Sequence, residues 1–296
     1  MRRGSYHLGA PFFCFIMETK LSSIPGPIGI FDSGYGGLTV FDKIKELMPE
    51  YDYIYLGDNA RAPYGPRSFE VVYRFTRQAV IKLLEEGCQL VILACNTASS
   101  KALRTIQQRD LPLWDPTRRV LGVIRPTVEL VEDMSNSKHV GIVGTVGTVT
   151  SESYQIEIAK MFPHIQVTSE ACPMWVPLIE NNEFNSPGAD YFVKKYLDEL
   201  FAKDPLIDTL ILGCTHYPLL LDKIRHYVPQ HVTLLPQGEY VARSLADYLK
   251  RHPEMDQKLT KRGTSRFLTT ESVEKFSEAA SLFLNCPIEV EKVVID

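Results

Sequence analysis

Apolar runs of strand length alternate with amphipathic helical segments along most of the chain. The strand-like runs are rich in Val, Ile and Leu and apolar at nearly every position, as in parallel strands buried on both faces. We predict strands at residues 28–31, 53–57, 90–94, 120–124, 140–143, 208–212 and 266–269. Helices are predicted over residues 38–48, 68–86, 97–108, 151–161, 187–203, 238–251 and 272–284. This alternation predicts an α/β protein with doubly wound parallel sheets.

Two of the predicted strands end in closely similar sequences. The segment Leu90-Val-Ile-Leu-Ala-Cys-Asn-Thr97 is matched by Thr209-Leu-Ile-Leu-Gly-Cys-Thr-His216, so a cysteine follows each strand. A strand that ends at a glycine-rich turn precedes each cysteine by 63 and 70 positions, at Asp32 and Gly144. Glycine-containing strands alone arise by chance in parallel sheets, but the added cysteine pair favours a duplication. We therefore expect two related, pseudo-symmetric α/β halves.

The composition narrows the class of protein. The chain has 296 residues, 45% hydrophobic and 23% charged, which suits one large or two small globular domains. The net charge is −4 and no basic block is concentrated in the sequence, so a nucleic-acid partner has no electrostatic support. The six cysteines are scattered without a C-x-x-C pair, which is typical of free thiols in a reducing cytoplasm.

Residues 1–27 differ from the rest of the chain. Arg2 and Arg3 precede an apolar stretch from Ala10 to Met17, which superficially resembles a secretion signal. The stretch lacks a small-x-small cleavage site and is too short to span a membrane, so no membrane association is expected. We expect a flexible N-terminal arm over residues 1–27, or a translation start at Met17.

Cys95 and Cys214 are candidate acid–base groups. Each stands at a predicted turn from strand to helix, where a helix N-terminus lowers a thiol pKa from its ordinary value of about 8.5 toward neutral pH. A thiol poised in this way accepts and returns a proton, so the pair is expected to face one ligand from opposite sides. Cys88, Cys172 and Cys286 are interpreted as small buried hydrophobic residues, and Cys14 is assigned to the arm.

Two other kinds of site use the same residues. Cys214 and His216 supply only two metal ligands, and no further Cys or His motif completes a zinc set, so no metal site is predicted. A Cys214–His216 pair for acyl transfer, with Asn96 as an oxyanion donor, is the stronger alternative, although it leaves Cys95 without a role.

Two turn-rich segments are candidate ligand contacts. The turn Gly34-Tyr-Gly-Gly37 is expected either to cradle a carboxylate or phosphate at a helix start or only to permit a tight turn. Asp32 stands where a carboxylate caps the helix that follows. The loop over residues 58–67 offers Tyr64 and backbone amides to a ligand.

With these residues assembled, the chain resembles the glutamate racemases of the cofactor-independent aspartate/glutamate racemase superfamily, from about Ile28 to Val294. The motifs that carry the resemblance are Gly29-Ile-Phe-Asp-Ser-Gly-Tyr-Gly-Gly-Leu-Thr39, Leu56-Gly-Asp58, Pro63-Tyr-Gly-Pro-Arg-Ser68, Ala94-Cys-Asn-Thr-Ala98, Gly122-Val-Ile124 with Pro126, Cys172-Pro173 with Val176-Pro-Leu-Ile-Glu180, and Gly213-Cys-Thr-His-Tyr-Pro218. Their length and order make the resemblance specific.

The resemblance implies a fold and an activity. It implies two α/β domains with the active site in the cleft between them: residues 28–121 plus 222–296 with Cys95, and residues 122–221 with Cys214. It implies racemisation of L- and D-glutamate without a cofactor, which supplies D-glutamate for peptidoglycan. Cys95 would exchange the α-proton with D-glutamate and Cys214 with L-glutamate, assisted by Asp32 and His216.

The resemblance also implies contacts and partners. The positions that match substrate contacts are Asp32, Ser33, Tyr64, Gly65, Asn96, Thr97, Glu180, Thr215 and His216. Many relatives have an acidic residue where Arg125 stands, and the arm has no reliable counterpart. The family commonly forms homodimers, and some members with long N-terminal extensions need a cell-wall precursor as activator. Two further hypotheses stay open: another reaction on this scaffold, such as racemisation of aspartate or a hydantoin, and a non-enzymatic role such as topoisomerase inhibition.

Overall fold

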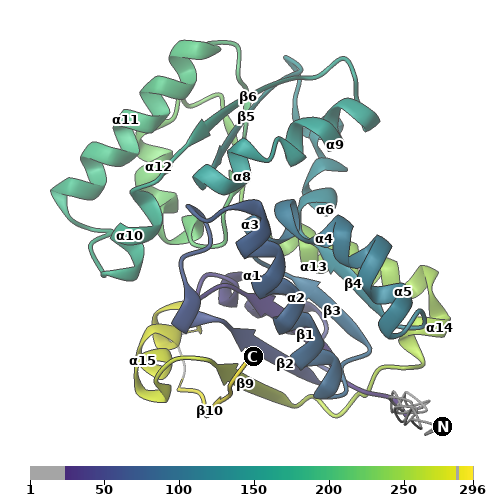
Figure 1. Ribbon diagram of the computed structural model, residues 1–296. Coiled ribbons are helices and arrows are strands. Elements are labelled where there is room, and N and C mark those ends of the chain that lie inside the picture. Colours follow the sequence, from purple (N-terminus) through teal and green to yellow (C-terminus); the bar gives the residue numbers. More distant parts are fainter. Residues whose placement is uncertain (1–23, 285–286, 296) are drawn as a thin grey trace, which may run out of the picture.

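Two lobes, each built on a parallel sheet, make up the computed structural model, which describes residues 24–284 and 287–295 (Figure 1). Most of the predicted arm, Cys14 and Cys286 lie outside the described residues. Gly26, which we assigned to the arm, instead forms a parallel bridge with Leu259. Its N–H donates to Lys258 O at 2.9 Å, so Gly26 belongs to the first lobe and not to an arm.

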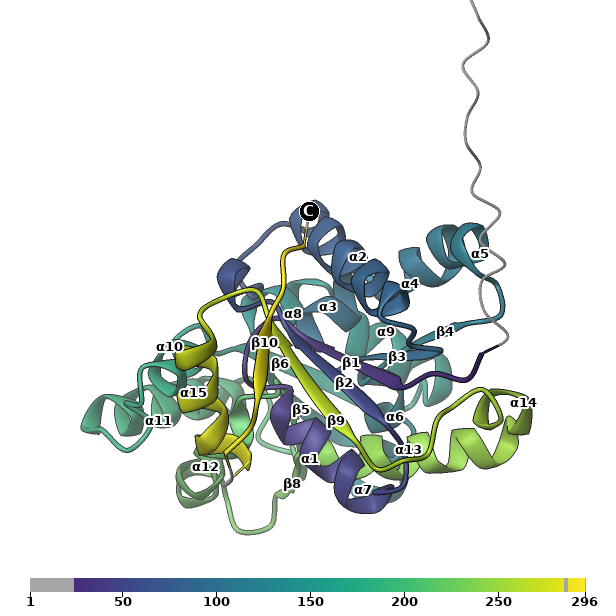
Figure 2. The ribbon, with the colours of Figure 1, turned by 90° about the horizontal axis from the view of Figure 1, so that it is seen from below.

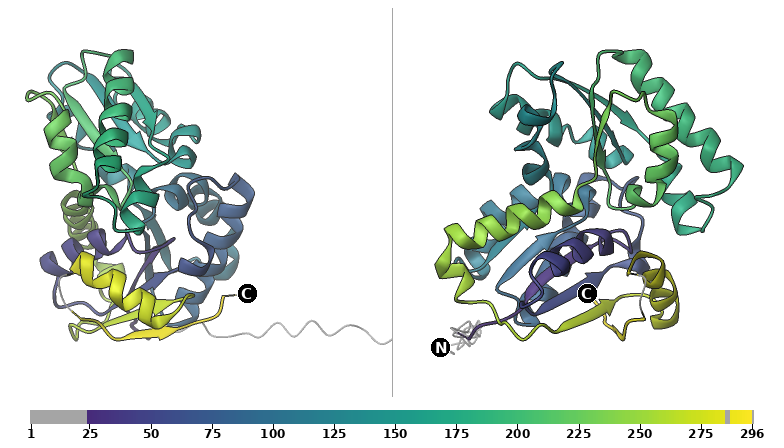
Figure 3. Two further views of the ribbon diagram at one scale, coloured as in Figure 1. Left: turned by 90° about the vertical axis from the view of Figure 1, so that its left-hand side faces the viewer. Right: turned by 180° about the vertical axis from the view of Figure 1, so that it is seen from behind.

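The first sheet has six parallel strands in the order β10-β9-β2-β1-β3-β4. They are β1 (Ile28–Asp32), β2 (Tyr53–Gly57), β3 (Leu90–Leu93), β4 (Arg119–Gly122), β9 (Ser265–Thr269) and β10 (Val290–Lys292). The last two come from the end of the chain, so the C-terminal segment returns to the first lobe (Figure 3).

The second sheet has four parallel strands in the order β6-β5-β7-β8. They are β5 (His139–Gly144), β6 (Gln166–Ala171), β7 (Thr209–Gly213) and β8 (Thr233–Leu235). Both sheets are therefore parallel and doubly wound, as the sequence predicts.

Helices cover both faces of each sheet. Those of the first lobe are α1 (Leu38–Leu47), α2 (Phe69–Glu85), α3 (Asn96–Lys101), α4 (Leu103–Thr105), α5 (Leu111–Trp114), α13 (Gly238–Arg251), α14 (Pro253–Asp256) and α15 (Val273–Leu284), with a 3₁₀ turn at Asn59–Arg61. Those between the lobes or on the second are α6 (Ile124–Val128), α7 (Val131–Met134), α8 (Val146–Thr150), α9 (Ser153–Met161), α10 (Trp175–Glu180), α11 (Pro187–Lys203) and α12 (Leu221–Tyr227), with a 3₁₀ turn at Tyr217–Leu220. None of the described helices is long and apolar enough to cross a membrane.

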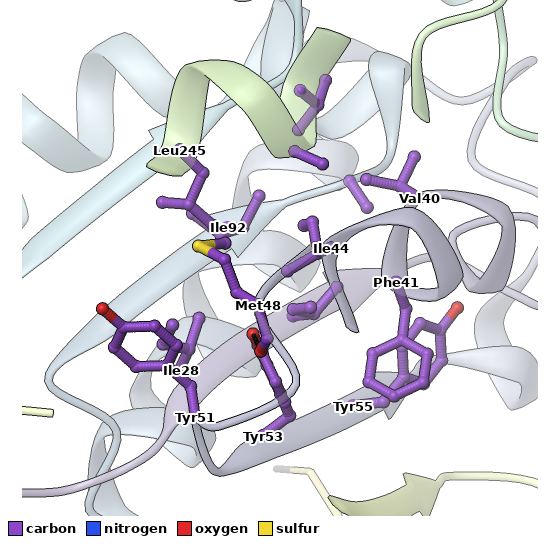
Figure 4. Packing of buried hydrophobic residues seen from close by; sticks show 14 of the residues in the cluster. Ile28, Val40, Phe41, Ile44, Met48, Tyr51, Tyr53, Tyr55, Ile92 and Leu245 are labelled. Atoms are coloured by element: carbon purple, nitrogen blue, oxygen red, sulfur yellow. Dashed lines mark hydrogen bonds between the residues drawn. The ribbon is translucent and has the colours of Figure 1, made fainter. Parts of the chain in front are cut away.

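The core of the first lobe is split by its sheet. Alternate residues of the strands face α1 and α13 on one side and α2 and α3 on the other (Figure 2). On the first side, Ile28, Ile92 and Tyr53 pack with Ile44 of α1 and Leu245 of α13 (Figure 4). Burial of such side chains on both faces fixes the register of the strands, and with it the place where each strand ends.

Two predicted elements differ in the structure. The helix expected over residues 97–108 is broken into short pieces, with a π-helical turn at Ile106–Asp110 before α5. Pro112 has no N–H to donate to the carbonyl four residues earlier, which accounts for the change of hydrogen bonding at Ile106–Asp110 but not for the earlier break at Ala102. We predicted that residues 222–296 belong to the first domain. This is wrong for residues 233–235, because β8 pairs with β7 in the second sheet.

Candidate active site

A small cavity lies where the carboxyl ends of strands from the two sheets meet. Its volume is about 130 Å³, far below the roughly 300–1,000 Å³ of pockets for drug-sized ligands, so it suits a small metabolite. The first lobe lines it with residues that follow β1, β2 and β3, and the second with residues that follow β5, β6 and β7. Carboxyl ends of strands are where open parallel sheets place their ligands.

Both candidate cysteines and nearly all of the expected contact residues line this cavity. The lining includes Ser33, Tyr64, Gly65, Cys95, Asn96, Thr97, Glu180, Cys214, Thr215 and His216. Of the expected residues only Asp32 is absent from the lining, because it is fully buried. Arg125 does not line the cavity either; it is exposed and pairs with Glu129.

Cys95 is held at the start of α3. Its sulfur caps this helix by accepting a hydrogen bond from the N–H of Ala98 at 3.4 Å, and it lies 3.4 Å from Ser33 Oγ. Burial raises the pKa of the Cys95 thiol to about 12, and the nearby Asp32 carboxylate adds to the rise, while the hydrogen bonds from Ser33 and Ala98 oppose it. Our expectation of a thiol poised near neutral pH is therefore wrong for Cys95, because desolvation outweighs the helix N-terminus.

Cys214 belongs to a chain of polar contacts with His216 and Glu180. Cys214 Sγ lies 3.8 Å from His216 Nδ1, and His216 Nε2 lies 3.1 Å from Glu180 Oε1. Burial lowers the pKa of His216, but its contacts with Cys214 and Glu180 overcome this and raise the pKa to about 10. His216 is therefore an imidazolium at neutral pH, and it can donate a hydrogen bond to the sulfur on one side and to the carboxylate on the other.

Asp32 links the turn after β1 of the first lobe to the turn after β7 of the second. Its Oδ2 accepts from the N–H of Gly34 at 2.9 Å, and its Oδ1 accepts from Thr215 Oγ1 at 3.4 Å. Burial raises the pKa of Asp32, and the charge of His216 opposes the rise. The turn at Gly34 therefore binds a carboxylate of the protein itself, that of Asp32. The N-cap residue of α1 is Gly37, which has no side-chain cap.

The loop between β2 and α2 is fixed by Asp58. Its carboxylate accepts from Tyr64 Oη at 2.5 Å, Arg61 Nε at 2.7 Å and Thr270 Oγ1 at 2.9 Å. The hydroxyl proton of Tyr64 is thus engaged by Asp58, and the loop brings Tyr64 and Gly65 to the lining of the cavity.

Several lining residues were not predicted from the sequence. Thr145 follows β5, and its Oγ1 lies 2.9 Å from Thr97 Oγ1, so a hydroxyl pair joins the lobes at the cavity wall. Cys172, which we interpreted as a buried hydrophobic residue, lines the cavity beside Pro173 and Val176. The signal for Thr145 was its place after the second glycine-containing strand, which corresponds to Ser33 after the first.

No group of three or more potential metal-ligating side chains gathers in the described part of the chain. Two α/β lobes with parallel sheets each bring a thiol to one small cavity, an arrangement that suits acid–base chemistry on a small molecule.

Comparison with known proteins identifies the family. Residues 28–243 match the family model of the Asp/Glu/Hydantoin racemases, and the chain belongs to this family. It is thus a racemase of the superfamily that the motifs indicate, which makes it an isomerase. A glutamate racemase of Shouchella clausii is 40% identical over 260 residues, which cover 88% of this chain and 90% of that protein.

Solved structures agree with this assignment. The glutamate racemase of Francisella tularensis, in complex with D-glutamate, has a TM-score of 0.81 and 32% identity, covering 92% of this chain and 98% of that one. The Escherichia coli glutamate racemase, in complex with L-glutamate and the activator UDP-MurNAc-Ala, has a TM-score of 0.71 and 28% identity, covering 92% of this chain and 99% of that one.

Proposed function

We propose that this racemase interconverts L- and D-glutamate by proton exchange between Cys95 and Cys214. The observation that carries the proposal is that one thiol from each lobe lines the same small cavity. Inversion of a stereocentre by proton transfer needs a base on one face of the carbon and an acid on the other. Two like groups at corresponding strand ends meet this need in both directions, because each is the acid in one direction and the base in the other.

The proposed reaction balances as a two-proton exchange. Cys214 as a thiolate takes the α-proton of L-glutamate, and the Cys95 thiol gives its proton to the opposite face of Cα, which yields D-glutamate. The reverse reaction begins with Cys95 as the thiolate and Cys214 as the thiol. The high pKa of Cys95 supports its role as the proton donor toward L-glutamate, and the His216 imidazolium supplies a hydrogen bond to Cys214.

The cavity is lined by neutral hydrogen-bond donors and by one acidic side chain, which suit the two carboxylates and the ammonium group of an amino dicarboxylate. We assign the substrate ammonium group to Glu180, whose carboxylate is the acidic group in the lining, and the carboxylates to Ser33, Asn96, Thr97, Thr215 and the backbone near Gly65. The same donors would stabilise the negative charge that develops as the α-proton leaves. Asp32 at the end of β1 and His216 after β7 would set the proton affinities of the cysteines. Exclusion of water from the site would strengthen these electrostatic effects.

The names of the relatives extend the proposal to a cellular role. We infer that the D-glutamate supplies peptidoglycan synthesis in the cytoplasm, and that a cell-wall precursor acts as an activator, as the Escherichia coli relative suggests. We also infer a homodimer. Racemisation rates with and without UDP-MurNAc-Ala test the activator, and sedimentation of the purified protein tests the dimer; an unchanged rate or a monomer would contradict the respective inference.

The activity itself is tested with purified protein and pure L- or D-glutamate, without pyridoxal phosphate. We expect both reactions to converge on a racemic mixture, as measured by chiral chromatography. Activity that strictly needs pyridoxal phosphate would contradict the mechanism, and turnover of aspartate in place of glutamate would contradict the substrate.

A further inference from the structure

A buried ring of three hydrogen bonds lies next to the cavity. Asn96 Nδ2 donates to Gln237 Oε1 at 2.6 Å, Gln237 Nε2 donates to Tyr154 Oη at 2.6 Å, and Tyr154 Oη donates to Asn96 Oδ1 at 2.7 Å. The three side chains are at most 3% exposed. They come from α3, from α9 and from the residue before α13, so the ring joins both lobes directly after Cys95. Only Asn96 of the three lines the cavity.

The direction of this ring is set from outside it. The Gln237 amide nitrogen also lies 2.9 Å from Thr127 Oγ1 and 3.4 Å from the backbone oxygen of Val123. Thr127 donates its own proton to the same oxygen of Val123, so its hydroxyl can only accept from Gln237. A backbone carbonyl never donates, and the nitrogen of Gln237 must therefore point toward Val123, with its oxygen toward Asn96.

This direction decides what Asn96 offers to a ligand. Because Gln237 presents an oxygen, Asn96 must turn its nitrogen toward Gln237 and its oxygen toward Tyr154. The carbonyl oxygen of Asn96 is then engaged by the Tyr154 hydroxyl, while one N–H of its amide has no partner among the described residues. The group that Asn96 has left for the cavity is a donor.

We infer that Gln237 and Tyr154 are positioning residues, which act through Asn96 to commit this part of the cavity to a hydrogen-bond donor and thereby to a substrate carboxylate. The inference deepens the proposed function and rests on it for the identity of the substrate. A free asparagine amide can rotate to present its oxygen, which repels a carboxylate; the ring removes that choice. Pre-organised donors bind and stabilise negative charge without a cost of reorientation.

The test compares two equally buried tyrosines that each donate a hydrogen bond to a carbonyl oxygen. Tyr154→Phe removes the donor to Asn96, whereas Tyr53→Phe removes a 2.7 Å bond to Met48 O in the core of the first lobe, away from the cavity. We expect both variants to lose stability, but only Tyr154→Phe to raise the KM for glutamate, by about tenfold, with a smaller change in kcat. That is the size of effect expected when a charge-assisted hydrogen bond is misaligned. Equal KM values in the two variants would overturn the inference.

Two measurements separate this inference from the proposed function. Titration calorimetry with glutarate, a dicarboxylate without an α-amino group, follows binding without turnover, and Tyr154→Phe should weaken it by a similar factor. In the wild-type protein, nuclear magnetic resonance should show an Asn96 side-chain amide that exchanges slowly with solvent and does not flip. A wild-type protein without racemase activity would contradict the proposed function alone. An Asn96 amide that flips freely would contradict the positioning role of Gln237 and Tyr154, even in an active enzyme.

Discussion

Cys95 and Cys214 occupy corresponding places in two different sheets, since Cys95 follows β3 of the first and Cys214 follows β7 of the second. β3 lies beside β1, and β7 lies beside β5, so each cysteine also stands next to a turn that follows a glycine-containing strand. The two turns bring Ser33 and Thr145 to the cavity wall. A duplicated α/β half thus explains why one pocket receives two thiols from matching positions.

Replacement of either cysteine should remove one face of the reaction. In Cys95→Ala and in Cys214→Ala we expect kcat/KM for racemisation to fall by about 10²–10⁴, the range for loss of a positioned acid or base. Cys88→Ala is the matched control, because Cys88 is fully buried in the core of the first lobe and does not line the cavity. It should lose stability on the order of 1 kcal/mol and keep its activity. Activity in either single variant close to that of Cys88→Ala would contradict the two-thiol mechanism.

The imidazolium of His216 gives the enzyme an alkaline limit. Its pKa is raised from 6.5 to about 10, so its stabilising contribution is complete below about pH 6.5 and is lost as the pH rises through about 10. We expect wild-type kcat/KM to fall as the pH rises through about 10, where His216 loses its charge. His216→Asn keeps a donor but does not titrate, so this decline near pH 10 should disappear and the activity should be lower throughout. An identical alkaline limb in the variant would show that another group controls it.

Much of the site could be predicted because its chemistry stands at strand ends. The two cysteine-bearing strands and the strand that ends at Asp32 are continuous apolar runs, and within each parallel sheet the carboxyl ends of the strands lie at one edge. The strand β6 was missed because Gln166–Ala171 is polar and only partly buried, which leaves no apolar run to detect. The hydroxyl pair of Thr97 and Thr145 and the bond from Thr215 to Asp32 join distant segments, and nothing local in the sequence signals them.

The proton affinity of Cys95 could not be predicted from local sequence either. A cysteine at a helix start is expected to have a lowered pKa, and Cys95 does cap α3 as the sequence predicts. The opposing effects are burial of the sulfur and the charge of the nearby Asp32 carboxylate, and both depend on tertiary packing. The predicted place of Cys95 at a helix start is correct, but long-range packing makes the predicted low pKa wrong.

Gly36 is a position where the site tolerates no side chain. A Cβ there would lie 2.4 Å from His216 Nδ1 and 2.5 Å from Thr215 Oγ1, which would displace both groups from Cys214 and Asp32. We expect Gly36→Ala to lower kcat/KM at least about 100-fold and to cost about 1–3 kcal/mol of stability. Gly188→Ala is the control, because the nearest atom to its Cβ would be Ser186 Oγ at 3.5 Å. Wild-type kinetics in Gly36→Ala would refute the close approach of this turn to His216.

Thr145 should contribute to substrate binding as well as to its own helix. Its hydroxyl caps α8 by accepting from the N–H of Thr148 at 3.2 Å, and it lines the cavity. Ser186 caps α11 in the same way at 3.2 Å without lining the cavity. Thr145→Val and Ser186→Ala should each lose about 1 kcal/mol, but only Thr145→Val should raise the KM for glutamate, by about fivefold. If the KM for glutamate were the same in Thr145→Val and Ser186→Ala, Thr145 would act only as a helix cap and would not contribute to substrate binding.

The origin of the α-hydrogen in newly formed product tests the two-thiol mechanism most directly. When L-glutamate is converted in heavy water, Cys214 removes the α-proton and Cys95 supplies the new hydrogen at Cα. Because Cys95 exchanges with the solvent, the hydrogen that it supplies is deuterium. At early times, mass spectrometry of the separated enantiomers should show D-glutamate deuterated at Cα and residual L-glutamate still carrying protium. D-glutamate that retains the original hydrogen of its substrate would mean that a single base returns the proton to the other face, and would contradict the mechanism.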